Sequence, residues 1–520
     1  MNGIRTAPNE IWAEYQAGMQ YKRSIGLPDI VRKNRNFYLG KQWEGVRAPD
    51  LDKPVFNIMG RVLSYFIALL VSDDVAVSVE PFNALPDGPL DRALRIAASQ
   101  IEQVIELNNM RLLNRDAIRD MAIDGDMCLH AYFDPNARTG QAAAGMIRAE
   151  LIDNLNVIFG NPYRRDKEAQ RYIILVQPRQ VEEIREEARA NGAPEGTIAA
   201  IVPDRSGDGR NAPQRYDCAV ELIKYWRQDD AVWYTKVTRN AVIKPPTNTE
   251  YTRYPIAYQS WMPVKNSYHG QAALTELIPN QIMINKLFAM ALKAQIETAF
   301  PKILYDGTKL ERWTNQIGAI RVNGDPTSAV ATALKGVELN PSVMSLIDAA
   351  IAYTRDLMGA SDAALGSVNP DNTSAIIAVQ KATAVPLELQ RIAFYQFVED
   401  YVRVFLDMIC ADYGLREVLT TDREGNPRLE LFDFSTLRDR VLNVRVDIGA
   451  GTYFSEIAQI QTLDNLYDKG VITDPLTYVE SIPEGYVKNR NKLIAQLKRR
   501  QAAAEALGGG DTPDSSAQRG

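Results

Sequence analysis

The chain has 520 residues, of which 46% are hydrophobic and 24% are charged, as in an ordinary globular protein. With 59 Lys and Arg against 65 Asp and Glu, its net charge is −6, which argues against a protein that wraps phosphates in a broadly basic surface. A chain of this length has room for about two to four domains, so its core needs neither disulfides nor metals. Cys128, Cys218 and Cys410 lie far apart in sequence, which favours a reducing compartment.

No stretch of the sequence predicts a membrane partner. The first 25 residues lack the apolar segment of a secretory signal. The longest apolar run, 62–71, is about half as long as a membrane span and is closed by Arg61 and Asp73. We therefore expect this run to be a buried helix.

The N-terminal region is predicted to be helical, with mixed α and β structure after it. Residues 10–45 carry apolar side chains at helical spacing among many charges, and Gly40 and Gly45 break the pattern. Further along we expect a helix over 56–71, a strand over 75–82 and an amphipathic helix over 90–109.

A strand-dominated lobe is predicted between 128 and 262. Short runs rich in β-forming residues lie at 128–134, 146–152, 155–160, 171–177, 219–226 and 232–239. One highly charged helix is expected over 180–190, and a loop over 200–216.

From His269 onwards the pattern becomes helical again. Residues 274–300 hold apolar side chains at helical spacing without an internal glycine, which predicts one helix about 40 Å long. Lys286, Lys293 and Glu297 are seven and four residues apart, so they share one face of that helix. This row is either a solvated face or a row that faces a channel, and the spacing leaves both readings open.

Pro301 ends this helix, and a small α/β unit is predicted between it and a second helix. The expected elements are strands at 302–306 and 319–323, a short helix at 310–314 and the second helix at 342–358. Residues 359–374 are rich in Gly, Asn, Asp and Ser and predict an unusually long loop. Thr373 or Ser374 then caps a long helix that runs to 413, which Pro386 is expected to kink.

The most distinctive stretches are NRNFYLGKQW, SYHGQAALTELIPNQIMINKL, PKILYDG and GASDAALGSVNPDNTSAIIAVQ. These stretches, in the order long helix, α/β insert, helix, loop and kinked helix, resemble the portal proteins of tailed bacteriophages, the ring-shaped connectors between head and tail. The resemblance covers most of the chain. It implies a multidomain α+β fold with a helical stem, an α/β clip, a mixed strand-rich wing and a helical crown.

The resemblance also implies a division of the chain. The wing is 1–265, the stem helix 266–300, the clip 301–340, the second stem helix 341–358, the channel loop 359–374, the long kinked helix 375–415, a strand-containing wing segment 416–452, the helical crown 453–505 and a disordered tail 506–520.

A portal forms a ring of about twelve copies at one capsid vertex, through which double-stranded DNA is packaged and ejected. For this chain the resemblance implies a passive role without a cofactor, assembly in the host cytoplasm and a place in the virion. The implied partners are further copies of the chain, double-stranded DNA, the terminase large subunit, the major capsid and scaffolding proteins, and a head-completion or adaptor protein.

The resemblance assigns two groups of residues. The residues expected to face DNA are Lys286, Lys293 and Glu297 of the stem and Asp362, Asn369, Asp371 and Asn372 of the channel loop. The residues expected to dock partners on the clip are Lys309, Arg312, Trp313 and Arg321. The alternative for the lysines is an ion pair with Glu297 or with a neighbouring copy, and for the loop it is an ordinary exposed connection.

The sequence carries no recognisable catalytic or metal-binding signature. It lacks the GxxxxGK[ST] motif that would hold ATP phosphates. Asp124 and Asp126 with His130, and the 204–209 segment, each lack the rest of a metal-ligand set and are better explained as turns. We therefore expect no enzyme. Two alternatives stay open: a soluble multidomain enzyme, marked by one dominant pocket with perturbed carboxylates, and another ring-forming phage structural protein.

Overall fold

The chain folds into two compact units in a computed structural model, which describes residues 4–71, 75–81, 88–138, 143–204, 217–300, 302–312, 323–324, 331–333, 342–357, 387–421, 427–438, 442–448, 453–472, 474–482, 493–494 and 496–498. Unit 1 comprises Met1–Val71 and Val77–Val446, and unit 2 comprises Ser72–Ala76 and Asp447–Gly520. About 51% of the chain is helix and 21% is strand, which confirms the predicted α+β class.

The helices are α1 (Pro8–Ser24), α2 (Leu27–Tyr38), α3 (Ile58–Val71), α4 (Gly88–Leu107), α5 (Met110–Asp124), α6 (Val181–Ala190), α7 (Glu195–Ala199), α8 (Ala273–Ala299), α9 (Ser342–Leu357), α11 (Glu388–Asp412), α12 (Tyr453–Asp468) and α13 (Pro475–Ser481), with single turns η1 (Asn154–Asn156) and η3 (Phe434–Leu437). The helices predicted over 56–71, 90–109, 180–190, 274–300 and 342–358 are thereby confirmed to within two residues at each end. None of the described helices combines the length and the apolar composition that crossing a membrane requires.

The strands are β1 (Val75–Pro81), β2 (Asp126–Asp134), β3 (Met146–Leu151), β4 (Val157–Phe159), β5 (Tyr172–Gln180), β6 (Cys218–Gln228), β7 (Ala231–Val237), β8 (Val242–Tyr251), β9 (Ile256–Ser260), β10 (Ile303–Tyr305), β11 (Ala331–Ala333), β12 (Leu415–Thr421), β13 (Pro427–Asp433) and β14 (Leu442–Ile448). The strand-rich lobe predicted between 128 and 262 is therefore confirmed.

A five-stranded antiparallel sheet in the order β4-β5-β6-β7-β8 is the largest sheet of unit 1. Helix α1 covers one of its faces, where Ile11 packs against Ile174 and Leu222. Strand β8 lies outside the strands predicted from sequence, because Pro245 and Pro246 obscure its pattern. It occupies the sheet edge, where a missing backbone donor is tolerated.

Helix α11 packs against a second, three-stranded sheet, and carboxylates along the helix bind residues outside that sheet. The sheet has the order β3-β2-β9. Asp400 pairs with Lys167, Asp407 accepts from the backbone of Thr252 (2.8 Å), and Asp412 accepts from the Tyr251 hydroxyl (2.5 Å). The predicted long helix is described only from Glu388, so the expected kink at Pro386 lies outside the described residues.

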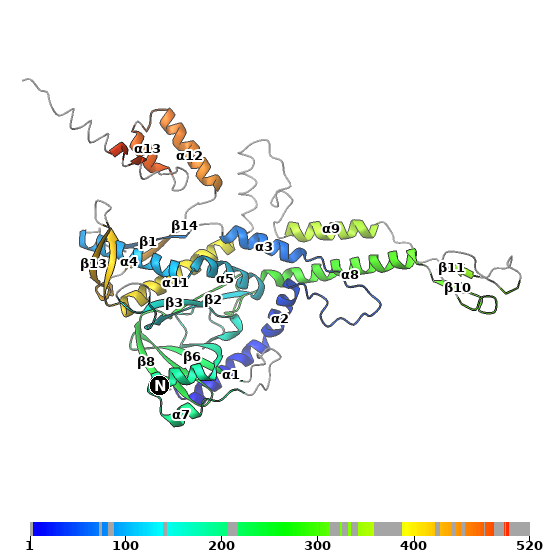
Figure 1. The fold of residues 1–520 in the computed structure, drawn as a ribbon, viewed down its shortest axis with the longest axis horizontal. Helices are drawn as coiled ribbons and strands as arrows, with labels where there is room; N and C mark the ends of the chain where they lie inside the picture. The colour runs from blue at the N-terminus through cyan, green and yellow to red at the C-terminus, as the bar shows by residue number, and fades with distance from the viewer. Residues whose placement is uncertain are drawn as a thin grey trace, which may run out of the picture. The chain divides into compact units, whose positions relative to one another are not determined.

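Helices α8 and α9 contact each other as the two arms of a hairpin, with the β10–β11 pair at the end away from the sheets (Figure 1). The short helix expected at 310–314 is wrong for residues 310–312, because a turn precedes them in which Asp306 accepts from the backbone N–H of Thr308 (3.0 Å). Most of the strand expected at 319–323 lies outside the described residues, and β10 pairs instead with β11.

Unit 2 contains the helices α12 and α13, together with the first residues of β1 and the last residues of β14. Asp474 caps α13 by accepting from the backbone N–H groups of Leu476 and Thr477. Tyr478 of α13 donates to Asp464 of α12 (2.5 Å), so a side-chain hydrogen bond joins the two helices.

Candidate nucleic-acid interface

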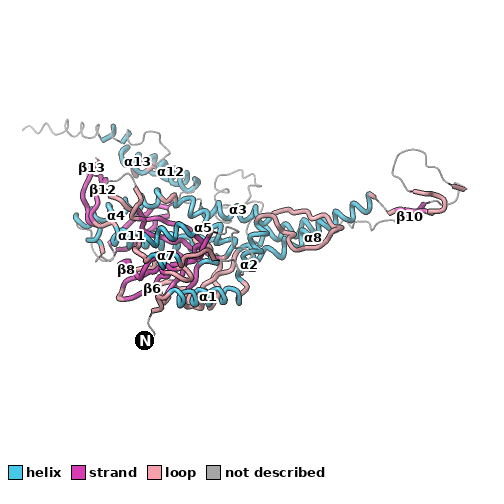
Figure 2. The backbone as a smooth tube through the Cα atoms, turned by 60° about the horizontal axis from the view of Figure 1, so that its bottom comes forward, coloured by secondary structure: helices cyan, strands magenta, loops and turns pink. Residues whose placement is uncertain are grey.

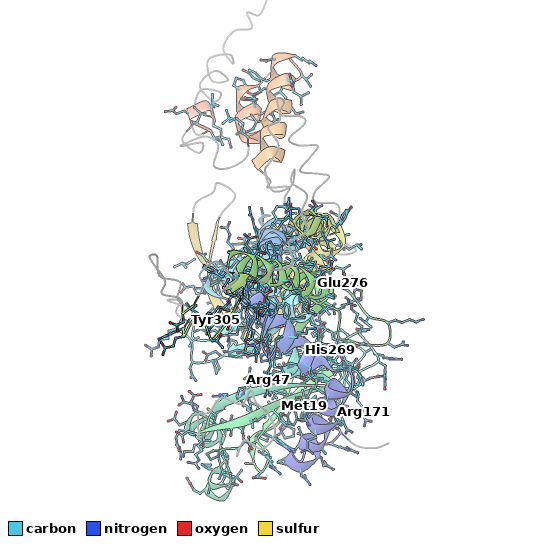
Figure 3. All side chains as sticks on the ribbon, turned by 90° about the vertical axis from the view of Figure 1, so that its right-hand side faces the viewer. Met19, Arg47, Arg171, His269, Glu276 and Tyr305 are labelled. Carbon is cyan, nitrogen blue, oxygen red and sulfur yellow. The ribbon has the colours of Figure 1, made fainter. Side chains whose placement is uncertain are left out.

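The segment just before the long helix α8 is hydrogen-bonded to the start of strand β2. Asp126 accepts hydrogen bonds from the backbone N–H of Gly270 (2.8 Å) and from Nδ1 of His269 (2.8 Å), and both side chains are buried. Burial lowers the pKa of His269, and the Asp126 carboxylate offsets this only in part, so the imidazole is neutral at neutral pH. Figure 3 looks from the β10–β11 side, with Tyr305 in β10 and with His269 and Glu276 marking the other end of α8.

The stretch NRNFYLGKQW, which is among those that carry the resemblance, packs directly on α8. Asn34 of α2 donates to Thr275 Oγ1 (2.9 Å), and Asn285 donates to Gln42 Oε1 (2.6 Å). Gln281 donates to the backbone oxygen of Phe56 (2.8 Å). The two stretches are more than 200 residues apart in sequence, and no pattern in either of them signals this contact.

The Asp124–Asp126 turn has a structural role that sequence reasoning only partly anticipates. Arg35 of α2 bonds to both Asp124 and Asp153, each with 2.6 Å between nitrogen and oxygen. Among the described residues, no group of three or more His, Cys, Asp or Glu side chains is placed to hold a metal ion. The acidic residues of this turn therefore join α2, α5 and the start of α8.

Lys286, Lys293 and Glu297 all lie exposed on α8, on the side that also presents Met283 and Met290. Within the described part of the chain, neither lysine has a carboxylate within ion-pair distance. The ion pair with Glu297 considered for these lysines is therefore not formed within one copy, so their ammonium groups are available to a partner.

A pocket of about 650 Å³ opens between α2, residues 41–46 and α8. Its lining includes the apolar side chains of Phe37 and Trp43 together with the exposed Lys33, Lys41 and Lys286. Lys286 is predicted from its spacing along α8, whereas nothing in the sequence marks Lys33 and Lys41, because an exposed lysine in a charged segment carries no signal of its own.

The outer half of the hairpin exposes apolar side chains that a single copy does not cover. Leu292 and Ile296 of α8 are 40% and 42% exposed, although they continue the face that is buried earlier in the helix. On α9, Leu346 and Tyr353 are exposed as well. A stripe of this kind is typical of a surface that meets another chain.

The other predicted site residues are only partly described. Lys309 pairs with Asp306 at 3.9 Å beside β10, and Arg312 is exposed nearby. The predicted site residues outside the described part of the chain are Trp313, Arg321, Asp362, Asn369, Asp371 and Asn372. The structure thus places three predicted residues on one face of α8 and two near the tip of the hairpin.

A second cavity, of about 1180 Å³, lies between the five-stranded sheet and strands β2 and β3. His130 contacts Glu150 through Nδ1 (2.9 Å) and Tyr225 through Nε2 (2.8 Å), and Gln177 donates to the same Glu150 oxygen (2.5 Å). The Asp412–Tyr251 pair lies on the same cavity. The predicted strand at 128–134 contains His130, but nothing in the sequence signals this network, whose members come together only in the folded chain.

Two of the carboxylates that line this cavity, Glu150 and Asp412, have pKa values shifted in opposite directions. Burial raises the pKa of Glu150, but hydrogen bonds from His130 and Gln177 outweigh it, so the pKa lies below its ordinary value. Burial raises the pKa of Asp412 to about 6, and the hydrogen bond from Tyr251 reduces the shift only in part. Carboxylates with divergent pKa values on one cavity are a feature of acid–base sites, and also of buried ion-pair networks.

Replacing Asp412 with Asn tests this pKa. The folded chain keeps the Asp412 proton up to about pH 6, whereas the unfolded chain loses it near pH 3.8, so the stabilising contribution of the protonated form is lost as pH rises through 6. Asn keeps an acceptor for Tyr251 without the charge. We expect Asp412→Asn to raise the free energy of unfolding by about 1–2 kcal/mol at pH 7.5 and to change it little at pH 4. Denaturant unfolding of both proteins at pH 7.5 and at pH 4 measures these free energies. A difference between the two proteins that is the same at both pH values would contradict the prediction.

The chain matches none of the protein-family models and none of the curated proteins with which it was compared. Support for a function therefore comes from its own residues and from the geometry described above.

Proposed function

We propose that the chain is a portal-type protein of a tailed bacteriophage. About twelve copies form a ring at one capsid vertex, and double-stranded DNA passes through the ring during packaging and ejection. The observation that carries this proposal is the α8–α9 hairpin, which combines an exposed apolar stripe with a row of unpaired lysines.

The apolar stripe supports assembly into a ring. A single copy leaves Leu292, Ile296 and the α9 residues Leu346 and Tyr353 in water. Burying apolar surface contributes about 25 cal/mol per Å², so hairpins from neighbouring copies are stabilised by covering one another. Contacts between different surfaces of identical copies close into a ring when the rotation between copies permits it.

The lysine row supports contact with moving DNA. In a ring, Lys286 and Lys293 become two bands of positive charge on a chain whose net charge is −6. Isolated bands on an otherwise acidic protein neutralise few phosphates, and DNA therefore does not bind tightly enough to stop moving. Glu297 and the loop residues Asp362, Asn369, Asp371 and Asn372 are proposed to keep the rest of the path weakly binding.

The remaining roles follow from the same proposal. The β10–β11 end with Lys309, Arg312, Trp313 and Arg321 docks the terminase large subunit during packaging and a head-completion or adaptor protein afterwards. The strand-rich part contacts the major capsid and scaffolding proteins. The chain itself is not an enzyme and uses no cofactor, since the terminase supplies the energy of packaging. It assembles in the host cytoplasm and remains in the virion.

Reversing the two lysines tests the DNA-facing role. We expect Lys286→Glu with Lys293→Glu to weaken binding of double-stranded DNA to assembled rings by about tenfold or more at low salt, with a shallower salt dependence. Fluorescence anisotropy of labelled DNA measures both quantities. Lys265→Glu with Arg189→Glu, at exposed positions away from α8, is the matched control. Unchanged binding by intact variant rings would mean that the row is an ordinary solvated face.

One observation favours a second candidate, a multidomain enzyme. The 1180 Å³ cavity holds Glu150 and Asp412 with pKa values shifted in opposite directions. If Glu150→Gln and Asp412→Asn chains still formed rings and packaged DNA, the cavity would be dispensable for the portal role. If the native chain turned over a substrate and either substitution abolished that turnover, the enzyme would be favoured instead.

A further inference from the structure

We propose that copies of this chain join head to tail, with the outer face of the β12–β13 hairpin of one copy seated in the α2–α8 pocket of the next. The proposal rests on the proposed function, which requires repeated contacts between copies, and it names the two surfaces that make one of them. Both surfaces belong to unit 1.

The first surface is one face of the antiparallel pair β12–β13. Leu415 lies opposite Asp433, and Glu417 lies opposite Leu431, so these four residues share a face because directly opposed residues point to the same side. Leu429 lies two residues before Leu431 and points to the same side. The three leucines Leu415, Leu429 and Leu431 are 63%, 61% and 63% exposed. The face is therefore apolar, with two carboxylates among its leucines.

The opposite face of the same hairpin packs on the rest of unit 1. Arg416 is buried, donates to the backbone oxygen of Gly145 (3.0 Å) and lies over the Tyr413 ring at 3.8 Å from its centre. Val418 is buried next to it, and Glu430 pairs with Arg92 of α4. The leucine face is therefore held outward by a rigid attachment.

The second surface is the pocket between α2, residues 41–46 and α8. Phe37 and Trp43 give it an apolar lining, and Trp43 is fixed by donating to the backbone oxygen of Pro54 (2.9 Å). Lys33 and Lys41 are exposed at the same pocket, and neither has a carboxylate within ion-pair distance among the described residues. Asp29 and Glu44 also line the pocket, and Asp29 pairs there with Arg32 (2.8 Å). The pocket thus combines an apolar lining with two lysines that form no ion pair and outnumber its one unpaired carboxylate.

The two surfaces are complementary in both properties. The leucines of one match the aromatic lining of the other, and Glu417 and Asp433 match Lys33 and Lys41. Complementary charges at the edge of an apolar contact set its register and exclude other partners. A second copy of the chain is therefore the occupant that the charges select.

The two surfaces lie at positions on unit 1 that allow the same contact to repeat from copy to copy. Figures 1 and 2 place β12 and β13 at one end of unit 1 and α2 beside α8, with the sheets in between. A contact between two different surfaces of the same molecule leaves one of each free on every pair of copies. Further copies add in the same way until the ring closes.

Charge reversal on each side, followed by reversal on both, tests the contact. We expect Lys33→Glu with Lys41→Glu to weaken self-association about tenfold or more, measured by sedimentation velocity across a concentration series, and Glu417→Lys to weaken it in the same direction. The chain that carries all three substitutions restores opposite charges between position 417 and positions 33 and 41, while Asp433 stays in place because it accepts hydrogen bonds from Ser435. It is expected to recover part of the lost association. Glu195→Lys and Arg189→Glu are matched controls on an exposed part of unit 1.

The outcomes separate this inference from the portal proposal. Variants that keep the native circular dichroism but self-associate like the native chain would overturn this contact and leave the ring proposal standing. The contact would also be overturned if the chain with all three substitutions self-associated no more strongly than the weaker of the two variants it combines. The two sets of charges would then act independently and not on each other. A native chain that does not self-associate at any concentration would overturn both.

Discussion

Replacing Lys22 with Met is expected to lower the free energy of unfolding by about 3–5 kcal/mol. Lys22 of α1 is fully buried, and its ammonium donates to the backbone oxygens of Asn154 (2.7 Å), Leu155 (2.9 Å) and Val157 (2.6 Å). Methionine fills a similar volume but leaves these carbonyl groups without donors, and each unsatisfied buried acceptor costs about 1–3 kcal/mol. Denaturant unfolding followed by tryptophan fluorescence measures the loss.

The deficit of this variant is also expected to depend on pH. Burial lowers the pKa of Lys22 from an ordinary 10.5 to about 7. Between these values the unfolded chain holds a proton that the folded chain has released, so native stability rises with pH in this window. The variant lacks the group, and its deficit is therefore larger at about pH 9.5 than at pH 7. Lys265→Met, at an exposed position between β9 and α8, is the control and should change the free energy of unfolding by less than about 0.5 kcal/mol.

Replacing Gly125 with Ala is expected to lower the free energy of unfolding by about 3–5 kcal/mol. Gly125 has a φ of +102°, and a Cβ there would lie 2.7 Å from the backbone oxygen of Gly270 at the entry to α8. Neither backbone can move freely, because Asp126 holds the N–H of Gly270 and the Gly125 oxygen accepts from the N–H of Trp261 (3.0 Å). The substitution therefore strains the junction that fastens α8 to the sheet.

Gly192→Ala is the matched control for the junction. Gly192 also has a positive φ, of +78°, but a Cβ there would meet nothing within 4 Å. The Gly192→Ala substitution should lower the free energy of unfolding by only about 1–2 kcal/mol, the conformational penalty of a left-handed residue. Equal losses for the two variants, measured by denaturant unfolding, would mean that the close approach to Gly270 contributes nothing.

Local patterns predicted the regular elements well, because they follow from spacing along the chain. The 27-residue helix α8 lies within one residue of the expected range, and the row Lys286, Lys293 and Glu297 lies on one exposed face, as its spacing requires. Strand β8 was missed because two prolines obscure an edge strand.

The contacts that build the candidate site could not be predicted in the same way. Gln42 meets Asn285, and the buried Lys22 meets the 154–157 backbone, across 243 and more than 130 residues of sequence. Each of these residues looks like an ordinary polar residue of an exposed helix or loop. Only the packing of α1 and α2 against the rest of unit 1 makes Lys22 the donor and Gln42 the acceptor of these buried hydrogen bonds, and a single sequence does not contain that information.

The ring is the central claim, and the mass of the native protein tests it most directly. We propose native mass spectrometry of the full chain over a range of concentrations, with negative-stain images of the same samples. We expect particles of about twelve 58.1 kDa copies, seen as rings with a central hole. A stable compact dimer, with no rings at any concentration, would contradict it and would favour the enzyme.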